Sequence, residues 1–141
     1  HPMMAVVQNA SDLVDPINYA RLVNVPGNRK HILQVQGGMD PYTPLSTAQN
    51  LAVAWHMPTL DYPGVTASSE HPGVALAGLA HVPLPLSATV PIAGEGEATA
   101  ALMIFPQADH FPVFHQNLAK TLYRELFKEI PLADPPVLTG Q

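Results

Sequence analysis

Two hydrophobic segments, each followed by a short polar loop and then by an amphipathic segment, constrain the fold of this chain most strongly. The first covers residues 31–36 and stops at Gly37 and Gly38, and the second covers residues 99–105 and stops at Pro106. Their apolar content predicts strands, and the lack of strict alternation is typical of parallel strands that are covered on both faces. We therefore predict an α/β fold with mostly parallel strands, flanking helices and right-handed crossovers.

Helices are predicted on both sides of these strands. Residues 45–56 and 112–130 carry apolar side chains at the i, i+3, i+4 spacing of a helix with one buried face. A shorter helix is predicted to start near Asp15 and Pro16, because aspartate suits the N-cap and proline suits the first turn. Residues 1–14 indicate a short helix or an extended arm.

The chain of 141 residues has the length of a single domain, or it is a fragment of a larger one. Its parts are the strand, loop and helix of 15–57, a Pro/Gly-rich excursion over 58–98, the second strand, loop and helix of 99–131, and a tail of 132–141 that we expect to be loose.

The excursion at 58–98 is the least regular part of the sequence. Apolar residues at 74–79 and 81–90 suffice for one or two short strands, and the prolines there confine such strands to edges. An exposed turn is expected at 94–97. Two roles are open for this β excursion: a lid over an apolar substrate, or an extra sheet edge that pairs with another subunit.

Composition excludes several classes of function. Only 12% of the residues are charged and the net charge is −5, so no basic surface is available for nucleic acid. Cysteine is absent, which excludes disulfides and thiolate chemistry. The seven histidines show no ligand spacing, so we expect no metal and no cofactor. Apolar runs are too short for a transmembrane segment.

Two titratable residues follow the predicted strands, Asp40 after the first and His110 after the second. Ligands of α/β sheets bind beyond the carboxyl ends of the strands, and an acid next to a histidine can orient it as a general base. Simpler interpretations exist for each residue. Asp40 can cap the helix at 45–56 or form an Asx-turn, and His110 can be an ordinary loop histidine.

Residues 31–44, HILQVQGGMDPYTP, resemble the strand and loop that carry the catalytic acid of the α/β-hydrolase superfamily. Residues 105–112, FPQADHFP, resemble the loop that carries its catalytic histidine, and a helix follows in both cases. The order of acid and then histidine is also that of the superfamily. The resemblance implies an esterase-like or lipase-like serine hydrolase in which His110 is the general base of the catalytic triad and Asp40 orients it.

The chain departs from the superfamily at the nucleophile. It contains no Gly-x-Ser-x-Gly motif and no counterpart of the oxyanion-hole segment. The serines are Ser11, Ser46, Ser68, Ser69 and Ser87. The resemblance therefore implies the C-terminal portion of a hydrolase whose serine lies on an N-terminal remainder, and the start at His1-Pro2 fits a processed product or a fragment. We expect the isolated chain to be inactive, and the whole enzyme to act on lipophilic esters.

A second hypothesis is non-enzymatic. The chain can be a self-standing α/β module that covers its exposed strand edges by pairing with a partner, most simply as a homodimer with a continuous sheet. Tyr42 and Phe111, which flank the two loop positions, either line an acyl pocket or serve packing.

Overall fold

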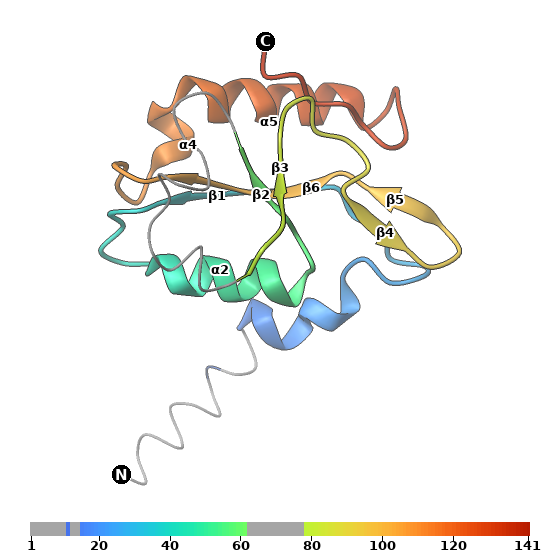
Figure 1. Cartoon of the computed structure of the whole chain (residues 1–141), viewed down its shortest axis with the longest axis horizontal. Helices are drawn as coiled ribbons and strands as arrows, with labels where there is room; N and C mark the ends of the chain where they lie inside the picture. Colours follow the sequence, from blue (N-terminus) through green and yellow to red (C-terminus); the bar gives the residue numbers. More distant parts are fainter. Residues whose placement is uncertain (1–10, 12–14, 62–77) are drawn as a thin grey trace, which may run out of the picture.

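The computed structural model is a three-layer α/β fold, with a central sheet between helices (Figure 1). The structure describes Ser11, residues 15–61 and residues 78–141. In chain order its elements are η1 (Pro16–Leu22), β1 (Ile32–Gly37), α2 (Leu45–Ala54), β2 (Thr59–Leu60), β3 (His81–Val82), β4 (Val90–Ile92), β5 (Gly96–Ala98), β6 (Ala100–Phe105), α4 (Pro112–His115) and α5 (Asn117–Glu129). Helices α4 and α5 cover one face of the sheet, and α2 with η1 covers the other (Figure 1).

The main sheet has the strand order β1-β6-β2-β3, and all its pairings are parallel. The two long strands pair along their full length, from Ile32 opposite Ala100 to Gly37 opposite Phe105. All six residues of β6 are buried because this strand is central and is covered on both faces. The predicted parallel α/β arrangement is therefore confirmed.

Alternation along β6 divides the core into two clusters. Toward α2 the sheet packs Ala100, Leu102 and Ile104 with Leu45, Ala48, Ala52, Met57, Val90, Ile92 and Ala98. Toward α5 it packs Ala101, Met103 and Phe105 with Leu33, Leu60, Leu86, Ala119, Leu122, Leu126 and Leu138. These two apolar layers hold the sheet between the helices, and the loops at the strand ends extend from this rigid part of the fold.

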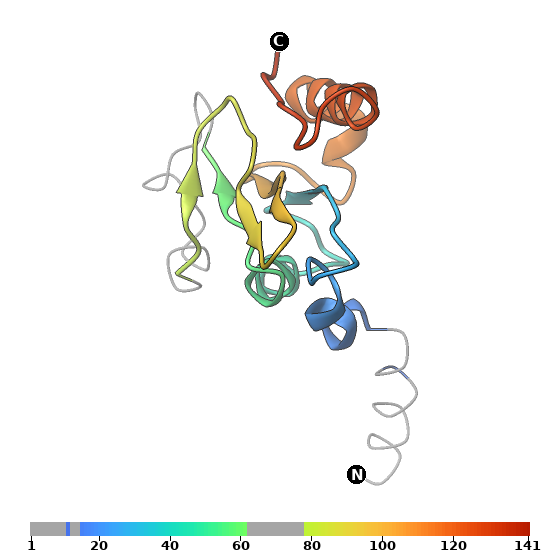
Figure 2. The ribbon, with the colours of Figure 1, turned by 90° about the vertical axis from the view of Figure 1, so that its right-hand side faces the viewer.

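The excursion contributes more to the sheet than the sequence predicted. Its short strands β2 and β3 extend the main sheet beyond β6, and residues 62–77 between them lie outside the described part of the chain. Strands β4 and β5 form an antiparallel hairpin, whose turn at 93–95 overlaps the exposed turn expected at 94–97, although Gly96 and Glu97 belong to β5. This hairpin lies at the end of the molecule opposite the β1–α2 and β6–α4 loops (Figures 1 and 2), so it does not cover those loops.

The helices also differ from prediction in detail. The first is a 3-10 helix, and Asp15 caps it as expected by accepting the Ile17 N–H at 3.0 Å. The predicted single helix at 112–130 is two helices, because Gln116 has an extended backbone that separates α4 from α5. The predicted arm at 1–14 lies outside the described residues, apart from Ser11.

The expectation of a loose C-terminal tail is wrong. Leu138 is buried and forms a backbone bridge with Leu86, and the Thr99 hydroxyl donates to the Pro136 carbonyl at 2.7 Å. The Glu125 carboxylate on α5 accepts the backbone N–H groups of Thr139 (2.7 Å), Gly140 (2.9 Å) and Gln141 (3.2 Å) and the Thr139 hydroxyl (2.8 Å). The tail is therefore held against α5 by an acceptor that lies fourteen or more residues away in the sequence.

We expect Glu125→Gln to release the last residues of the tail. Burial raises the pKa of Glu125, but the hydrogen bonds from Gly140, Thr139 and Gln141 lower it by more. The stabilisation by the ionised group is therefore present above the ordinary glutamate pKa of about 4.3 and is lost as the pH falls below it. Amide hydrogen exchange at 139–141 is expected to accelerate in Glu125→Gln but not in the control Glu129→Gln. Equal exchange in both variants would show that the carboxylate does not hold the tail.

Candidate active site

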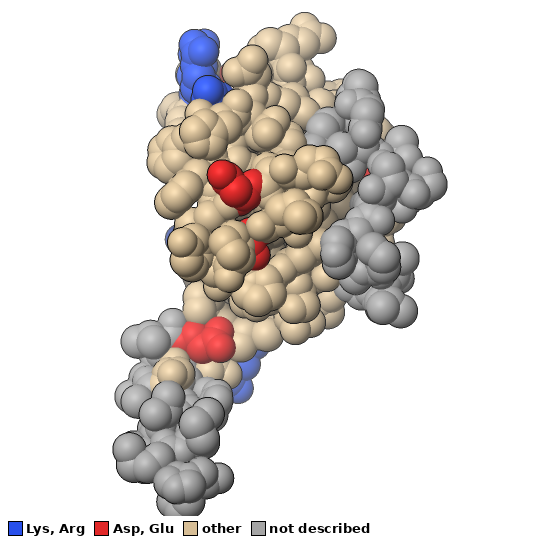
Figure 3. Space-filling view, turned by 90° about the vertical axis from the view of Figure 1, so that its left-hand side faces the viewer, with Lys and Arg blue, Asp and Glu red and all other residues tan. Residues whose placement is uncertain are grey.

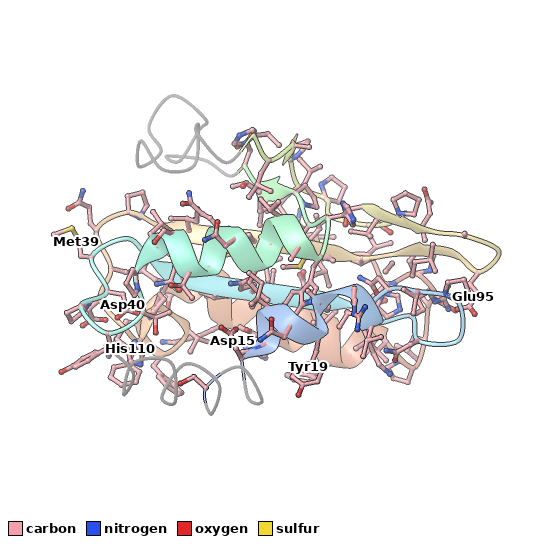
Figure 4. The ribbon with its side chains drawn as sticks, turned by 90° about the horizontal axis from the view of Figure 1, so that it is seen from below. Asp15, Tyr19, Met39, Asp40, Glu95 and His110 are labelled. Carbon is pink, nitrogen blue, oxygen red and sulfur yellow. The ribbon has the colours of Figure 1, made fainter. Side chains whose placement is uncertain are left out.

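The two loops that follow β1 and β6 lie side by side at the carboxyl end of the sheet. Asp40 comes from the loop between β1 and α2, and His110 comes from the loop between β6 and α4. Figure 4 places both side chains at one end of the molecule, with Glu95 of the β4–β5 turn at the other end. The parallel pairing of β1 with β6 produces this arrangement, because it brings the carboxyl ends of the two strands together.

Gly37 and Gly38 permit an unusually close approach of the two loops. A Cβ atom on Gly37 would stand 1.8 Å from the Asp109 carbonyl oxygen, and one on Gly38 would stand 2.5 Å from the Pro106 carbonyl oxygen. Two backbone hydrogen bonds use this proximity: Gly38 N–H donates to Phe105 O, and Met39 N–H donates to Ala108 O, each at 2.9 Å. The glycine pair is needed for this contact between the loops.

Asp40 and His110 form a hydrogen-bonded pair. The distance between His110 Nδ1 and Asp40 Oδ2 is 2.7 Å, which is short for a nitrogen–oxygen contact and typical of a bond to an ionised acceptor. The Asp40 side chain is 3% exposed, whereas that of His110 is 35% exposed. The pair therefore has a buried acid and a histidine that reaches the surface.

The Asp40 carboxylate is held by its own loop as well. Its Oδ1 accepts the backbone N–H groups of Tyr42 (2.8 Å) and Thr43 (2.9 Å), so the Asx-turn interpretation is confirmed. The helix-cap interpretation is wrong, because Pro44 occupies the N-cap of α2 and no side chain caps that helix. Asp40 thus organises its loop and faces His110 at the same time.

These contacts keep Asp40 ionised. Burial raises the pKa of the carboxyl group, but hydrogen bonds from Thr43, His110 and Tyr42, together with the charge of His110, outweigh burial and lower the pKa to about 2. An ionised carboxylate can only accept, so His110 Nδ1 must carry the proton. In the neutral imidazole the lone pair is then on Nε2, which has no hydrogen-bond partner among the described residues.

Exposed apolar side chains surround His110. The Tyr42 and Phe111 rings meet the imidazole edge to face, with centroids at 5.3 Å and 4.7 Å, and Phe111 in turn approaches Phe114. Tyr42 is nevertheless 77% exposed, and Met39, Phe111 and Phe114 are also exposed. In the space-filling view of this end, the described surface is mostly uncharged and carries a few carboxylates (Figure 3).

Comparisons of the chain with protein-family models, with curated proteins and with solved structures found no match. The interpretation of this site therefore depends on its geometry and on the sequence motifs.

In the part of the chain that the structure describes, no three or more histidine and acidic side chains gather in a way that could hold a metal ion. No described helix is long and apolar enough to cross a membrane.

A second acid–histidine pair, which the sequence did not reveal, lies between β2 and β3. Asp61 follows β2, and its Oδ1 is 3.1 Å from His81 Nδ1. This pair could not be predicted from the sequence, because β2 has only two residues and no recognisable strand pattern. Both members of this pair are partly exposed, in contrast to the buried Asp40.

Gln36, which contacts the Asp40 loop from within β1, likewise carries no signal in the sequence that indicates a role in the site. No serine is hydrogen-bonded to His110 in the described part of the chain, which includes Ser11, Ser46 and Ser87. Ser68 and Ser69 lie outside the described residues.

Proposed function

We propose that this chain is the C-terminal part of a serine ester hydrolase of the α/β-hydrolase fold, with Asp40 and His110 as two members of its catalytic triad. The observation that carries the proposal is the 2.7 Å contact between Asp40 Oδ2 and His110 Nδ1 at the carboxyl ends of adjacent parallel strands. A buried, ionised acid next to a partly exposed histidine is the arrangement that a general base requires.

The roles follow from the protonation states. Nε2 of His110 accepts the proton of the serine hydroxyl as the serine oxygen attacks the ester carbonyl carbon. The resulting imidazolium then gives that proton to the leaving alcohol, and an acyl-serine remains. Water hydrolyses this intermediate with His110 again as the base. Asp40 stays ionised throughout, holds the imidazole in the productive tautomer and stabilises its positive charge.

The serine and the oxyanion donors are assigned to an N-terminal remainder of the protein. The chain lacks a Gly-x-Ser-x-Gly motif, and no described serine is hydrogen-bonded to His110. Strand β1 pairs with β6 on one side, and no other described strand pairs with its other edge. That free edge offers a place for the remainder of the sheet to join.

The surroundings of His110 favour an ester with an apolar acyl or alkyl group. Met39, Tyr42, Phe111 and Phe114 are exposed at this end, and burying such surface against a substrate releases it from water. The mechanism requires no cofactor.

A fluorophosphonate probe, which labels activated serines, tests this proposal. We expect the longest product of the reading frame to be labelled and the 141-residue chain to remain unlabelled. His110→Ala is expected to abolish labelling of the longer product, whereas His81→Ala, which disrupts the other acid–histidine pair, retains it. Absence of labelling in the wild-type longer product would refute the hydrolase, and labelling of the 141-residue chain would refute the external nucleophile.

The same free edge of β1 supports a second candidate, a non-catalytic module that self-associates through its sheet. Alternate residues of β1 direct their backbone N–H and C=O groups away from β6, and these groups can pair with a second copy. One acceptor on this strand is already used, because the Tyr123 hydroxyl donates to the Leu33 carbonyl at 2.9 Å. Sedimentation of the chain tests the module: a monomer excludes it, whereas a dimer that a proline substitution at Val35 dissociates shows that the chain pairs through β1.

A further inference from the structure

The buried side-chain amide of Gln36 lies beneath the Asp40 loop. Gln36 is the fifth residue of β1 and is 6% exposed. A buried amide without hydrogen-bond partners would destabilise the fold, so the partners that Gln36 has found indicate what it does.

Three oxygens surround the Gln36 amide nitrogen. Nε2 is 2.9 Å from the Gly37 carbonyl oxygen, 3.0 Å from the Thr43 carbonyl oxygen and 3.3 Å from Asp40 Oδ2. All three accept, so the amide is oriented with its nitrogen toward the loop. One side chain thus connects Gly37, the last residue of β1, with Thr43 near the end of the loop, and reaches the Asp40 carboxylate between them.

We propose that Gln36 is the positioning residue of the acid–histidine pair. Its side chain holds the Asp40 loop so that Asp40 Oδ2 faces His110. This inference rests on the proposed function, because it assigns Gln36 a role in the same site. The Thr43 carbonyl that Gln36 binds belongs to the residue whose N–H holds Asp40 Oδ1. Gln36 therefore acts on both oxygens of Asp40, on Oδ2 directly and on Oδ1 through Thr43.

Glutamine is well suited to this position because it donates without carrying charge. A lysine there would offer Asp40 a cation that competes with the imidazolium. A methionine would fill similar space and leave the Gly37 and Thr43 carbonyls without this donor. A glutamate would keep the shape and place a second negative charge next to Asp40.

Gln34 provides a matched control. It precedes Gln36 by two residues on the same strand, so both side chains are on the same face of the sheet. Its Nε2 donates to the Ala48 carbonyl of α2 at 3.2 Å, and it makes no hydrogen bond to the Asp40 loop. Gln34→Met removes a glutamine amide from β1 without touching the Asp40 loop.

NMR of the 141-residue chain tests the inference without any need for activity. The two readouts are the low-field resonance of the His110 Nδ1 proton, assigned by its loss in His110→Ala, and the acid titration of the Asp40 carboxyl carbon. Gln36→Met is expected to abolish or strongly weaken the resonance and to move the Asp40 titration to higher pH. Gln34→Met is expected to change neither. A folded Gln36→Met protein with the wild-type His110 resonance and the wild-type Asp40 titration would overturn the inference.

Gln36→Glu keeps the inference testable if Gln36→Met does not fold. The introduced carboxylate has no hydrogen to donate to the Gly37 and Thr43 carbonyls. We therefore expect the His110 Nδ1 proton resonance to be lost at neutral pH. The resonance is expected to recover on acidification, when the introduced carboxylate gains a proton. An unchanged resonance at neutral pH would overturn the inference. Failure of fluorophosphonate labelling in the longer product refutes the hydrolase alone, because neither NMR readout depends on a serine.

Discussion

Gly37→Ala is expected to separate the two loops and to lower the free energy of unfolding by about 3 kcal/mol or more. The added Cβ would stand 1.8 Å from the Asp109 carbonyl oxygen, and the atom it meets is backbone. The backbone at Gly37 is held by the neighbouring hydrogen bonds from Gly38 N–H to Phe105 O and from Met39 N–H to Ala108 O. It therefore cannot move away from Asp109 without disturbing these bonds. Denaturant unfolding measures the loss of stability.

The same variant is expected to lose the low-field His110 resonance, because Asp109 immediately precedes His110. Gly94→Ala is the control, since Gly94 has a positive φ of 80° and open space around the Cβ position. Its cost is limited to backbone strain of about 1 kcal/mol, and the resonance is expected to persist. A Gly37→Ala protein with wild-type stability and resonance would show that the loops do not require the close contact.

The predictable parts of the fold are those set by local pattern. Strands β1 and β6 have six residues each, enough for apolar content and a terminal glycine or proline to identify them. Their parallel arrangement then follows from the alternation of strands with helices. The placement of Asp40 and His110 at one end of the sheet follows from these two strands being adjacent, whereas their contact also requires the close approach of the loops at Gly37 and Gly38.

The remainder depends on contacts between distant residues. Strands β2 and β3 have two residues each, and their place in the sheet comes from pairing with β6 and with each other. The tail at 132–141 has the composition of a loose segment and is fixed by Glu125 and by a bridge to Leu86. Such partners leave no periodic signal in the sequence.

The same limit on prediction from sequence applies to Gln36 within the site. Its neighbours on the strand predict burial, and a glutamine in a buried strand gives no indication of which oxygens it will meet. Those oxygens are at Gly37, Asp40 and Thr43, and the path of the loop alone determines that they converge. The residues that do the proposed chemistry were therefore predictable, whereas the one that positions them was not.

Asp40→Asn is expected to remove the His110 resonance from the 141-residue chain and to slow serine acylation in the longer product by about 10⁴-fold. The new amide oxygen can still accept from Tyr42 and Thr43, which leaves the amide nitrogen facing His110. His110 then accepts at Nδ1 and carries its proton on Nε2. In that tautomer Nε2 cannot take the serine proton.

The variant also changes the response to acid. The Asp40 pKa of about 2 lies below its ordinary value because the hydrogen bonds from Thr43, His110 and Tyr42 outweigh the effect of burial. A lowered pKa means that the carboxylate stabilises the fold above about pH 3.9, and that this contribution is lost as the pH falls toward 2. Unfolding free energies measured from pH 5 down to pH 2 are therefore expected to fall less steeply in Asp40→Asn than in the wild type.

Asp61→Asn separates the role of Asp40 from a general effect of removing a carboxylate next to a histidine. It alters a pair of the same chemistry, with an Asp61 Oδ1 to His81 Nδ1 distance of 3.1 Å, but on the neighbouring strands β2 and β3. We expect this control to retain the His110 resonance and the acylation rate. If Asp61→Asn instead abolished acylation while Asp40→Asn preserved it, the acid of the triad would be Asp61, and His81 would take the place assigned to His110.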